Sequence, residues 1–242
     1  ISSARAAKAI CKRWLQRFNT LPDAFVVEGP LAGGHLGFSP DQLELPEYRL
    51  EKLVPEVVGA VAPFCEERNV EIPVIAAGGV YTGADIHNFM QLGAAGVQMA
   101  TRFVATHECD ANIGFKQSYV EARKEDLVII KSPVGLPGRA IKNQFIKDVE
   151  EGKRKPFTCP YHCISSCNCT DSPYCIALAL LNAKRGKLKK GFAFAGDNAY
   201  KVDRIVSVKE LISSLLDEYL RVSGNPHAEC PAHTMIGVQA TA

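Results

Sequence analysis

The chain has 242 residues, of which 47% are hydrophobic and 22% charged, and its formal net charge is +2. This composition is ordinary for a globular protein with a sizeable core, and the small net charge argues against nucleic acid or an anionic membrane as the main partner. No run approaches the roughly 20 apolar residues of a membrane span, and no charged-then-apolar leader opens the sequence. We therefore expect a cytoplasmic protein.

In the first 111 residues, helical and strand-like patterns alternate. Apolar residues recur at helical spacing in the segments 1–22, 50–69 and 80–94. Short, continuously apolar runs, typical of strands buried on both faces, occupy 23–29, 72–79 and 94–100. Alternation with short loops is typical of parallel βα units. We predict three adjacent parallel strands in chain order, with the helices packed on the outside.

From residue 112 the sequence becomes more charged and loses this alternation. Helical patterns are predicted for 114–126, 138–155, 172–188 and 206–220. We therefore divide the chain into an α/β part at 1–111, a helical, cysteine-containing extension at 112–222 and a loose tail at 223–242.

Small residues follow the end of each predicted strand. They are Gly33 and Gly34 before His35, Gly78 and Gly79 before a helix capped by Thr82, and Ala100 and Thr101. In parallel α/β proteins ligands gather at the carboxyl ends of strands, and two neighbouring loops of this kind form the phosphate site of a (β/α)₈ barrel. The alternative is a set of tight turns without a ligand. None of the loops has the dinucleotide fingerprint or a Walker sequence.

Five of the nine cysteines fall between residues 159 and 175. Their spacing matches neither a zinc finger nor a bacterial ferredoxin. Three interpretations stay open: a zinc or iron–sulfur site, reduced packing thiols, or redox pairing. A metal site requires that four ligands converge, and the candidates are Cys159, Cys163, Cys167 and Cys169, with His162 as a substitute for one thiol.

Three stretches, VVEGPLAGGHLGF (26–38), IPVIAAGGVYTGADI (72–86) and GAAGVQMATRF (93–103), resemble the nitronate monooxygenase (2-nitropropane dioxygenase) family in order and spacing. A near relative of that family is the flavin-dependent enoyl-acyl-carrier-protein reductase. The resemblance is specific over about residues 1–110 and looser through GFAFAGDNAY (191–200) to about residue 220. It implies a (β/α)₈ barrel of the TIM type that holds FMN. The chain would supply the last three βα units of that barrel plus the extension, because the family's first five strands have no counterpart in it.

The resemblance also implies roles for individual residues. His35 would be the catalytic histidine beside the flavin. The residues implied to bind the cofactor are Gly33, Gly34, Gly78, Gly79, Gln98, Met99, Ala100 and Thr101. Many relatives have glycine at the position of Ala100, so we expect a negative φ there.

The implied activity is oxidation of alkyl nitronates with O₂, with His35 taking a proton next to an electron-withdrawing group. A histidine that only positions the substrate is the alternative role. Two other functions stay open: reduction of enoyl thioesters with NAD(P)H, or an inactive partial barrel that binds nothing or docks to a partner. The expected partner is a small-molecule nitronate or enoyl thioester, without nucleic acid or membrane.

Overall fold

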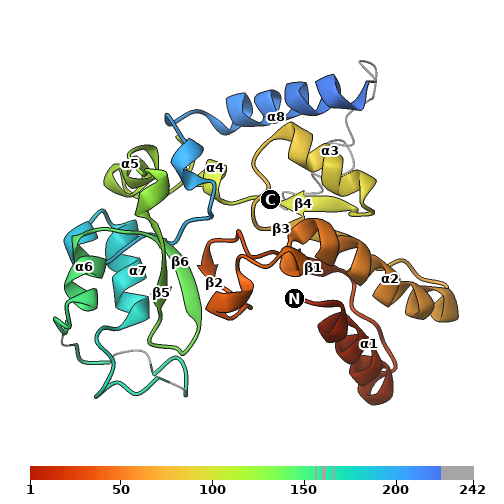
Figure 1. Ribbon diagram of the computed structural model, residues 1–242, viewed down its shortest axis with the longest axis horizontal. Coiled ribbons are helices and arrows are strands. Elements are labelled where there is room, and N and C mark those ends of the chain that lie inside the picture. Colours follow the sequence, from red (N-terminus) through yellow and green to blue (C-terminus); the bar gives the residue numbers. More distant parts are fainter. Residues whose placement is uncertain (156, 160–161, 166, 225–242) are drawn as a thin grey trace, which may run out of the picture.

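A computed structural model describes residues 1–155, 157–159, 162–165 and 167–224. Its parallel sheet has the order β1-β3-β4, and each neighbouring pair is parallel. The strands are β1 (Phe25–Glu28), β3 (Val74–Ala77) and β4 (Gly96–Gln98). The predicted adjacency, direction and order of the three strands are therefore confirmed (Figure 1).

The three predicted helices of this part are present: α1 (Ala4–Phe18), α2 (Leu50–Arg68) and α3 (Gly83–Gln91). Helix α3 begins at a capping box, in which the Thr82 hydroxyl accepts from the Asp85 amide at 3.1 Å and the Asp85 carboxylate accepts from the Thr82 amide at 2.8 Å. Val27 and Ala76 of the sheet and Val54 and Val57 of α2 are completely buried in one core. This burial fixes the strands, and with them the loops that follow their carboxyl ends.

A second, antiparallel sheet has the order β2-β6-β5. Its strands are β2 (Gly34–His35), β5 (Leu127–Lys131) and β6 (Pro137–Ile141). Two of these strands, β5 and β6, lie within the extension predicted as helical, and β6 replaces the start of the helix predicted at 138–155. The β-branched run at 128–130 favours a strand, and Gly135, at φ +88°, allows the hairpin turn between β5 and β6.

The other helices of the chain surround this second sheet or pack beside the first (Figure 1). They are α4 (Thr101–Val104), α5 (Ile113–Val120), α6 (Gln144–Glu150), α7 (Ile176–Lys184) and α8 (Val208–Ser223). Short 3₁₀ turns lie at Pro40–Gln42, Pro46–Tyr48, Lys124–Asp126, Leu188–Lys190 and Ala199–Lys201. The predicted helix at 138–155 is reduced to α6, which Asn143 caps through its side-chain oxygen.

Helix α8 returns to the first part of the chain and lies along α3 (Figure 1). The Gly83 amide donates to the Glu218 carboxylate at 2.7 Å, and a side chain at Gly83 would lie 2.1 Å from the Leu215 carbonyl oxygen. Helix α8 ends at Ser223, so the predicted loose tail begins within it, and residues 225–242 lie outside the described residues. None of the described helices combines the length and the apolar character that crossing a bilayer requires.

Candidate active site

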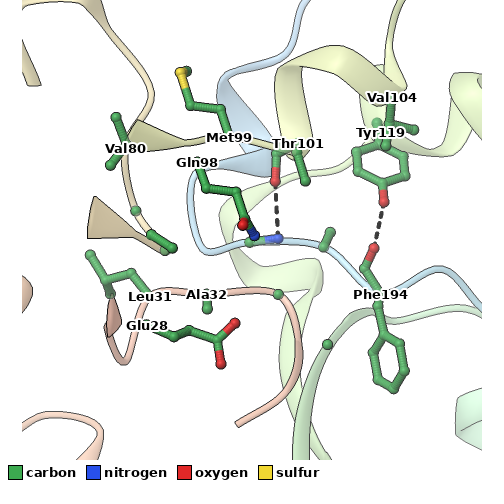
Figure 2. Close-up of a pocket in the computed structure, with 18 residues that line it drawn as sticks. Glu28, Leu31, Ala32, Val80, Gln98, Met99, Thr101, Val104, Tyr119 and Phe194 are labelled. Atoms are coloured by element: carbon green, nitrogen blue, oxygen red, sulfur yellow. Dashed lines mark hydrogen bonds between the residues drawn. The ribbon is translucent and has the colours of Figure 1, made fainter. Parts of the chain in front are cut away.

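A cavity of about 240 Å³ opens at the carboxyl ends of β1, β3 and β4 (Figure 2). Its walls are mostly backbone and small side chains from the three loops that follow these strands. All eight residues implied to bind a cofactor line it: Gly33, Gly34, Gly78, Gly79, Gln98, Met99, Ala100 and Thr101. The structure therefore brings together, in one cavity, residues that lie up to 68 positions apart in the chain.

The glycines of these loops are required for two different reasons. Gly78 and Gly79 have φ values of +85° and +96°, which L side chains rarely adopt. At Gly33 the reason is close packing, because an added Cβ would lie 2.4 Å from the Ala195 carbonyl carbon. Gly34 combines a φ of +83° with open space, since nothing lies within 4 Å of an added Cβ. The loops thus leave room for a ligand to approach the backbone closely.

Ala100 has a φ of −123°, so the expectation of a negative φ at this position is confirmed. The next residue, Thr101, points its hydroxyl oxygen at the Gly196 amide, which donates to it at 3.2 Å (Figure 2). A hydroxyl that accepts one hydrogen bond still has its own hydrogen to donate. Thr101 can therefore donate to an anionic ligand in the cavity.

A segment of the extension, residues 194–198, crosses all three loops, and we call it the strap. The Gly196 amide binds the Thr101 hydroxyl, the Asp197 amide donates to the Leu31 carbonyl at 3.0 Å, and the Asn198 side chain donates to the Gly79 carbonyl at 2.7 Å. Sequence reasoning assigned no role to this segment. Its small residues and its place in the looser resemblance were the available signals.

Buried residues hold the strap and the first loop from behind. The Tyr119 hydroxyl donates to the Phe194 carbonyl at 2.5 Å (Figure 2). Arg139 on β6, only 5% exposed, donates to the carbonyls of Pro30 and Ala32 at 2.5 and 2.8 Å. The pKa of Arg139 is lowered, mainly by burial. The Asp197 carboxylate, whose oxygen lies 3.5 Å from the Arg139 Nε, opposes this shift in part. The second sheet therefore fixes the position of the loop after β1.

His35 lies on β2, beside the cavity. The resemblance implies that His35 lies beside the flavin, but among the described residues His35 does not line the cavity. Its ring instead packs edge-on against Phe194, which does line the cavity, with the ring centroids 5.0 Å apart. Its Nε2 lies 2.8 Å from the Ser132 hydroxyl, and burial lowers the pKa of the imidazole. The catalytic role of His35 stays a prediction.

Glu28 ends β1 and lines the cavity together with Gln98 (Figure 2). Burial raises the pKa of the Glu28 carboxyl. Sequence reasoning gave this residue no role, although it is the one charged residue in an otherwise apolar strand. Among the described residues, the lining includes no lysine or arginine, so an anion in the cavity would be bound by backbone amides and hydroxyls.

The cysteine-rich segment does not assemble a metal site within the described residues. No group of three or more histidine, cysteine, aspartate or glutamate side chains is arranged there to hold an ion. Cys159 and Cys169 are hydrogen-bonded, which raises the pKa of the Cys169 thiol, and Cys167 lies 3.6 Å from the Ser172 hydroxyl. The metal interpretation of Cys159, Cys163, Cys167 and Cys169 with His162 thus lacks the convergent ligands that it requires.

A parallel sheet with glycine-rich loops around a cavity at the carboxyl ends of its strands defines a ligand-binding α/β protein. The sequence matches the family model described as nitronate monooxygenase over residues 1–218. The chain therefore belongs to the nitronate monooxygenase family, a family of oxidoreductases, as its motifs predict.

Individual relatives agree with this assignment. A probable nitronate monooxygenase of Staphylococcus aureus (strain Newman) is 35% identical over 130 residues, which is 53% of this chain and 34% of that protein. The structure of FabK from Thermotoga maritima superposes with a TM-score of 0.65 at 28% identity, over 93% of this chain and 60% of that one. A nitroalkane oxidase from Streptomyces ansochromogenes, at 22% identity and a TM-score of 0.64, shares the fold over 92% of this chain and 57% of its own.

The alignment with the Staphylococcus aureus relative thus spans about a third of that relative, and the chain covers less than two thirds of the two structural neighbours. The family and these neighbours place the fold in the TIM-barrel class. Within it, the described residues form a mixed α/β structure with one parallel and one antiparallel sheet.

Proposed function

We propose that this chain belongs to an FMN-dependent oxidoreductase that oxidises alkyl nitronates with O₂. The observation that carries the proposal is the cavity itself, because eight residues selected from the motifs line one space at the carboxyl ends of three parallel strands. Ligands of parallel α/β proteins occupy this edge of the sheet, and barrels bind phosphate groups at the loops of their last strands.

The residues present fit a flat cofactor that carries a phosphate. Gly34 leaves open space beside the backbone, so a ring can lie close to the first loop. The backbone amide of Gly79 and the hydroxyl of Thr101, two residues that line the cavity, can donate to a phosphate. FMN held there would supply the electron acceptor for oxidation of the nitronate with O₂.

The role of this chain's own side chains is to bind, orient and exchange a proton. In the proposal, His35 takes a proton from the carbon next to the nitro group of a neutral nitroalkane. Its lowered pKa keeps the imidazole neutral, and therefore able to accept a proton, at neutral pH. A preformed nitronate has already lost this proton and does not need the base.

We further propose that the sheet β1-β3-β4 is the last part of an eight-stranded barrel, with residues 1–111 in the barrel, 112–222 in the extension and 223–242 in a tail. Two observations support this. Within the described residues β1 and β4 are the outer strands of the sheet; β4 has one side open to a further strand, and the outer side of β1 is hydrogen-bonded to Ile1. In addition, the Val26 carbonyl accepts from Ile1 at 2.8 Å and the Glu28 amide donates to the Ile1 carbonyl at 2.8 Å, which is how a neighbouring strand would bind β1.

The test is made on the purified complete protein. A yellow protein with flavin absorption, which releases FMN on denaturation, is expected; a colourless one that does not take up added FMN contradicts the proposal. Turnover is then compared between propionate-3-nitronate with O₂ and a crotonyl thioester with NADH. Faster turnover of the nitronate supports the proposed activity, whereas turnover of the thioester alone assigns the site to the alternative reduction.

A further inference from the structure

Within the part of the chain that the structure describes, the polar side chain that contacts the His35 ring is that of Ser132. Ser132 follows β5 and is only 3% exposed. Its backbone is fixed on both sides of the hairpin turn, because its amide donates to the Leu136 carbonyl at 3.1 Å and its carbonyl accepts from the Gly135 amide at 3.0 Å. His35 is fixed by the same sheet, where it pairs with Gly138 of β6. The 2.8 Å contact therefore joins a strand residue, His35, to the first residue of the hairpin turn that follows β5.

The ring nitrogens of His35 can be distinguished by this contact. Nε2 is engaged by Ser132, so Nδ1 is the nitrogen left to exchange a proton with a substrate. A neutral imidazole carries one hydrogen, and Nδ1 can accept a proton only when that hydrogen is on Nε2. In that tautomer Nε2–H donates and the Ser132 oxygen accepts. The oxygen has two lone pairs, and the Val134 amide approaches it at 3.4 Å.

We propose, on the basis of the proposed function, that Ser132 is the positioning residue for His35. Its hydroxyl oxygen accepts the Nε2–H of His35 and leaves the lone pair of Nδ1 to take the substrate proton. In this step the C–H bond of a neutral nitroalkane breaks, the proton moves to Nδ1, and the electron pair stays on the substrate as the nitronate. The edge-on contact with Phe194, at an interplanar angle of 66°, also restrains the orientation of the His35 ring.

The proton position can be measured without turnover. In the complete, FMN-loaded protein with ¹⁵N-labelled histidine, we expect an imidazole N–H cross-peak of His35 at Nε2, protected from exchange with water. Ser132→Ala is expected to lose this peak, and Ser132→Thr, which keeps the hydroxyl, to retain it. A parent peak at Nδ1, or a protected peak unchanged in Ser132→Ala, overturns the proposal. The parent spectrum alone decides the tautomer, so the test does not depend on the folding of a variant.

Kinetics separate a positioning role from a structural one. For nitroethane, Ser132→Ala is expected to lower kcat about tenfold, as for the loss of one hydrogen bond, with KM changed by less than about twofold. Preformed ethyl nitronate, which needs no base, is expected to react at the parent rate, and Ser132→Thr to recover kcat. Ser118→Ala is the matched control, because its hydroxyl donates to the Phe115 carbonyl at 2.6 Å on α5, away from the cavity lining.

The outcomes distinguish this inference from the proposed function. Equal losses with nitroethane and the nitronate in Ser132→Ala overturn the positioning role. If the Nε2–H peak behaves as expected while His35→Ala keeps full activity on nitroethane, the hydrogen bond stands and the role of His35 as a base is wrong.

Discussion

The imidazole of His35 is half-buried between Ser132 and Phe194, and this burial has a kinetic consequence. Removing water disfavours the charged imidazolium, so the pKa of His35 lies below the ordinary value of about 6.5. The neutral, proton-accepting form then persists to more acidic pH than for an exposed histidine.

For kcat/KM with nitroethane we therefore expect a plateau from neutral pH down to about 6.5 and a fall only below that value, where His35 becomes protonated. The same shift acts on stability. The unfolded chain binds a proton more readily at this histidine than the folded one, so the contribution of His35 to stability is lost as the pH falls through the interval between the two pKa values. A pH–rate profile checks the first statement, and an inflection above pH 7 would contradict it.

Removing the imidazole tests the role of His35 directly. His35→Ala is expected to keep FMN, because the proposed phosphate contacts lie in other loops, and to lower turnover of nitroethane by about 10²–10⁴-fold. The loss with the preformed nitronate should be smaller, since the proton is already gone. Steady-state rates on both substrates, with flavin content as the control, provide the measurement. Equal activity of variant and parent on nitroethane would show that His35 has only a structural role in β2.

Gly79 combines a positive φ with a place in the cavity wall, and a matched glycine separates the two properties. In Gly79→Ala the added Cβ would lie 3.0 Å from the Leu31 Cβ, at a φ of +96°. We expect a loss of about 1–2 kcal/mol in the free energy of unfolding from the positive φ, together with weaker FMN binding. Gly152→Ala has a φ of +79° and open space around it, so it should lose similar stability and keep its affinity for FMN.

Urea unfolding and flavin-fluorescence titration of the two glycine variants check this prediction. Equal FMN affinity in Gly79→Ala and the parent would remove this loop from the proposed cofactor site.

At the scale of elements, segments with a local sequence pattern were predicted correctly, and segments that depend on contacts between residues far apart in the chain were not. The alternation of periodic and apolar segments up to residue 100 is a local signal, and it predicted strands β1, β3 and β4 in their order. The cap of helix α3 at Thr82 was predicted from a local signal as well. Strand β5 lies between the predicted helices, where no element was predicted. Strand β6 was predicted as helix because charged residues such as Arg139 and Lys142 also suit the exposed face of a helix. Arg139 instead is buried on the carbonyls of Pro30 and Ala32, more than 100 residues away, and no local pattern reveals such a contact.

The same limit applied to the site. Glycine pairs at strand ends are visible in the sequence and account for Gly33, Gly34, Gly78 and Gly79 of the cavity wall, whereas the other four predicted residues came from the family resemblance. The strap could not be predicted, because its function is to bind three loops through backbone carbonyls and a hydroxyl that carry no sequence signature. Ser132 was missed for the same reason, since its partner His35 is 97 residues away.

The strap yields a prediction that depends on one hydrogen bond. In Asn198→Asp the side chain can no longer donate to the Gly79 carbonyl, and its charge repels that oxygen. We expect FMN affinity to fall about tenfold, the effect of one lost hydrogen bond, while the protein stays folded. Asn182→Asp is the control, because Asn182 on α7 also donates to a carbonyl, that of Lys190 at 3.3 Å, and does not line the cavity. If both variants bind FMN like the parent, the strap does not position the Gly79 loop.

At the scale of the whole molecule, the parallel sheet has two outer strands and carries exposed apolar side chains near one of them. Val26 on β1 is 38% exposed, and Leu31 in the loop that follows is 41% exposed. Open strand edges with apolar side chains pair readily with further strands. In the proposed eight-stranded barrel these positions are covered, and the cavity gains the walls that a cofactor of the size of FMN needs.

This arrangement makes the isolated chain and the complete barrel behave differently. Residues 1–242 alone are expected to self-associate through the exposed apolar side chains of Val26 and Leu31. They are also expected to bind FMN at least about tenfold more weakly than the complete protein, because ligand sites bury most of their ligand. Light scattering after gel filtration and flavin titration measure the two effects. Val26→Thr, which replaces an apolar edge side chain, should reduce self-association of the isolated chain and leave the complete protein unchanged. A monomeric isolated chain that binds FMN as tightly as the complete protein would show that the three strands need no others, and the partial-barrel proposal would be wrong.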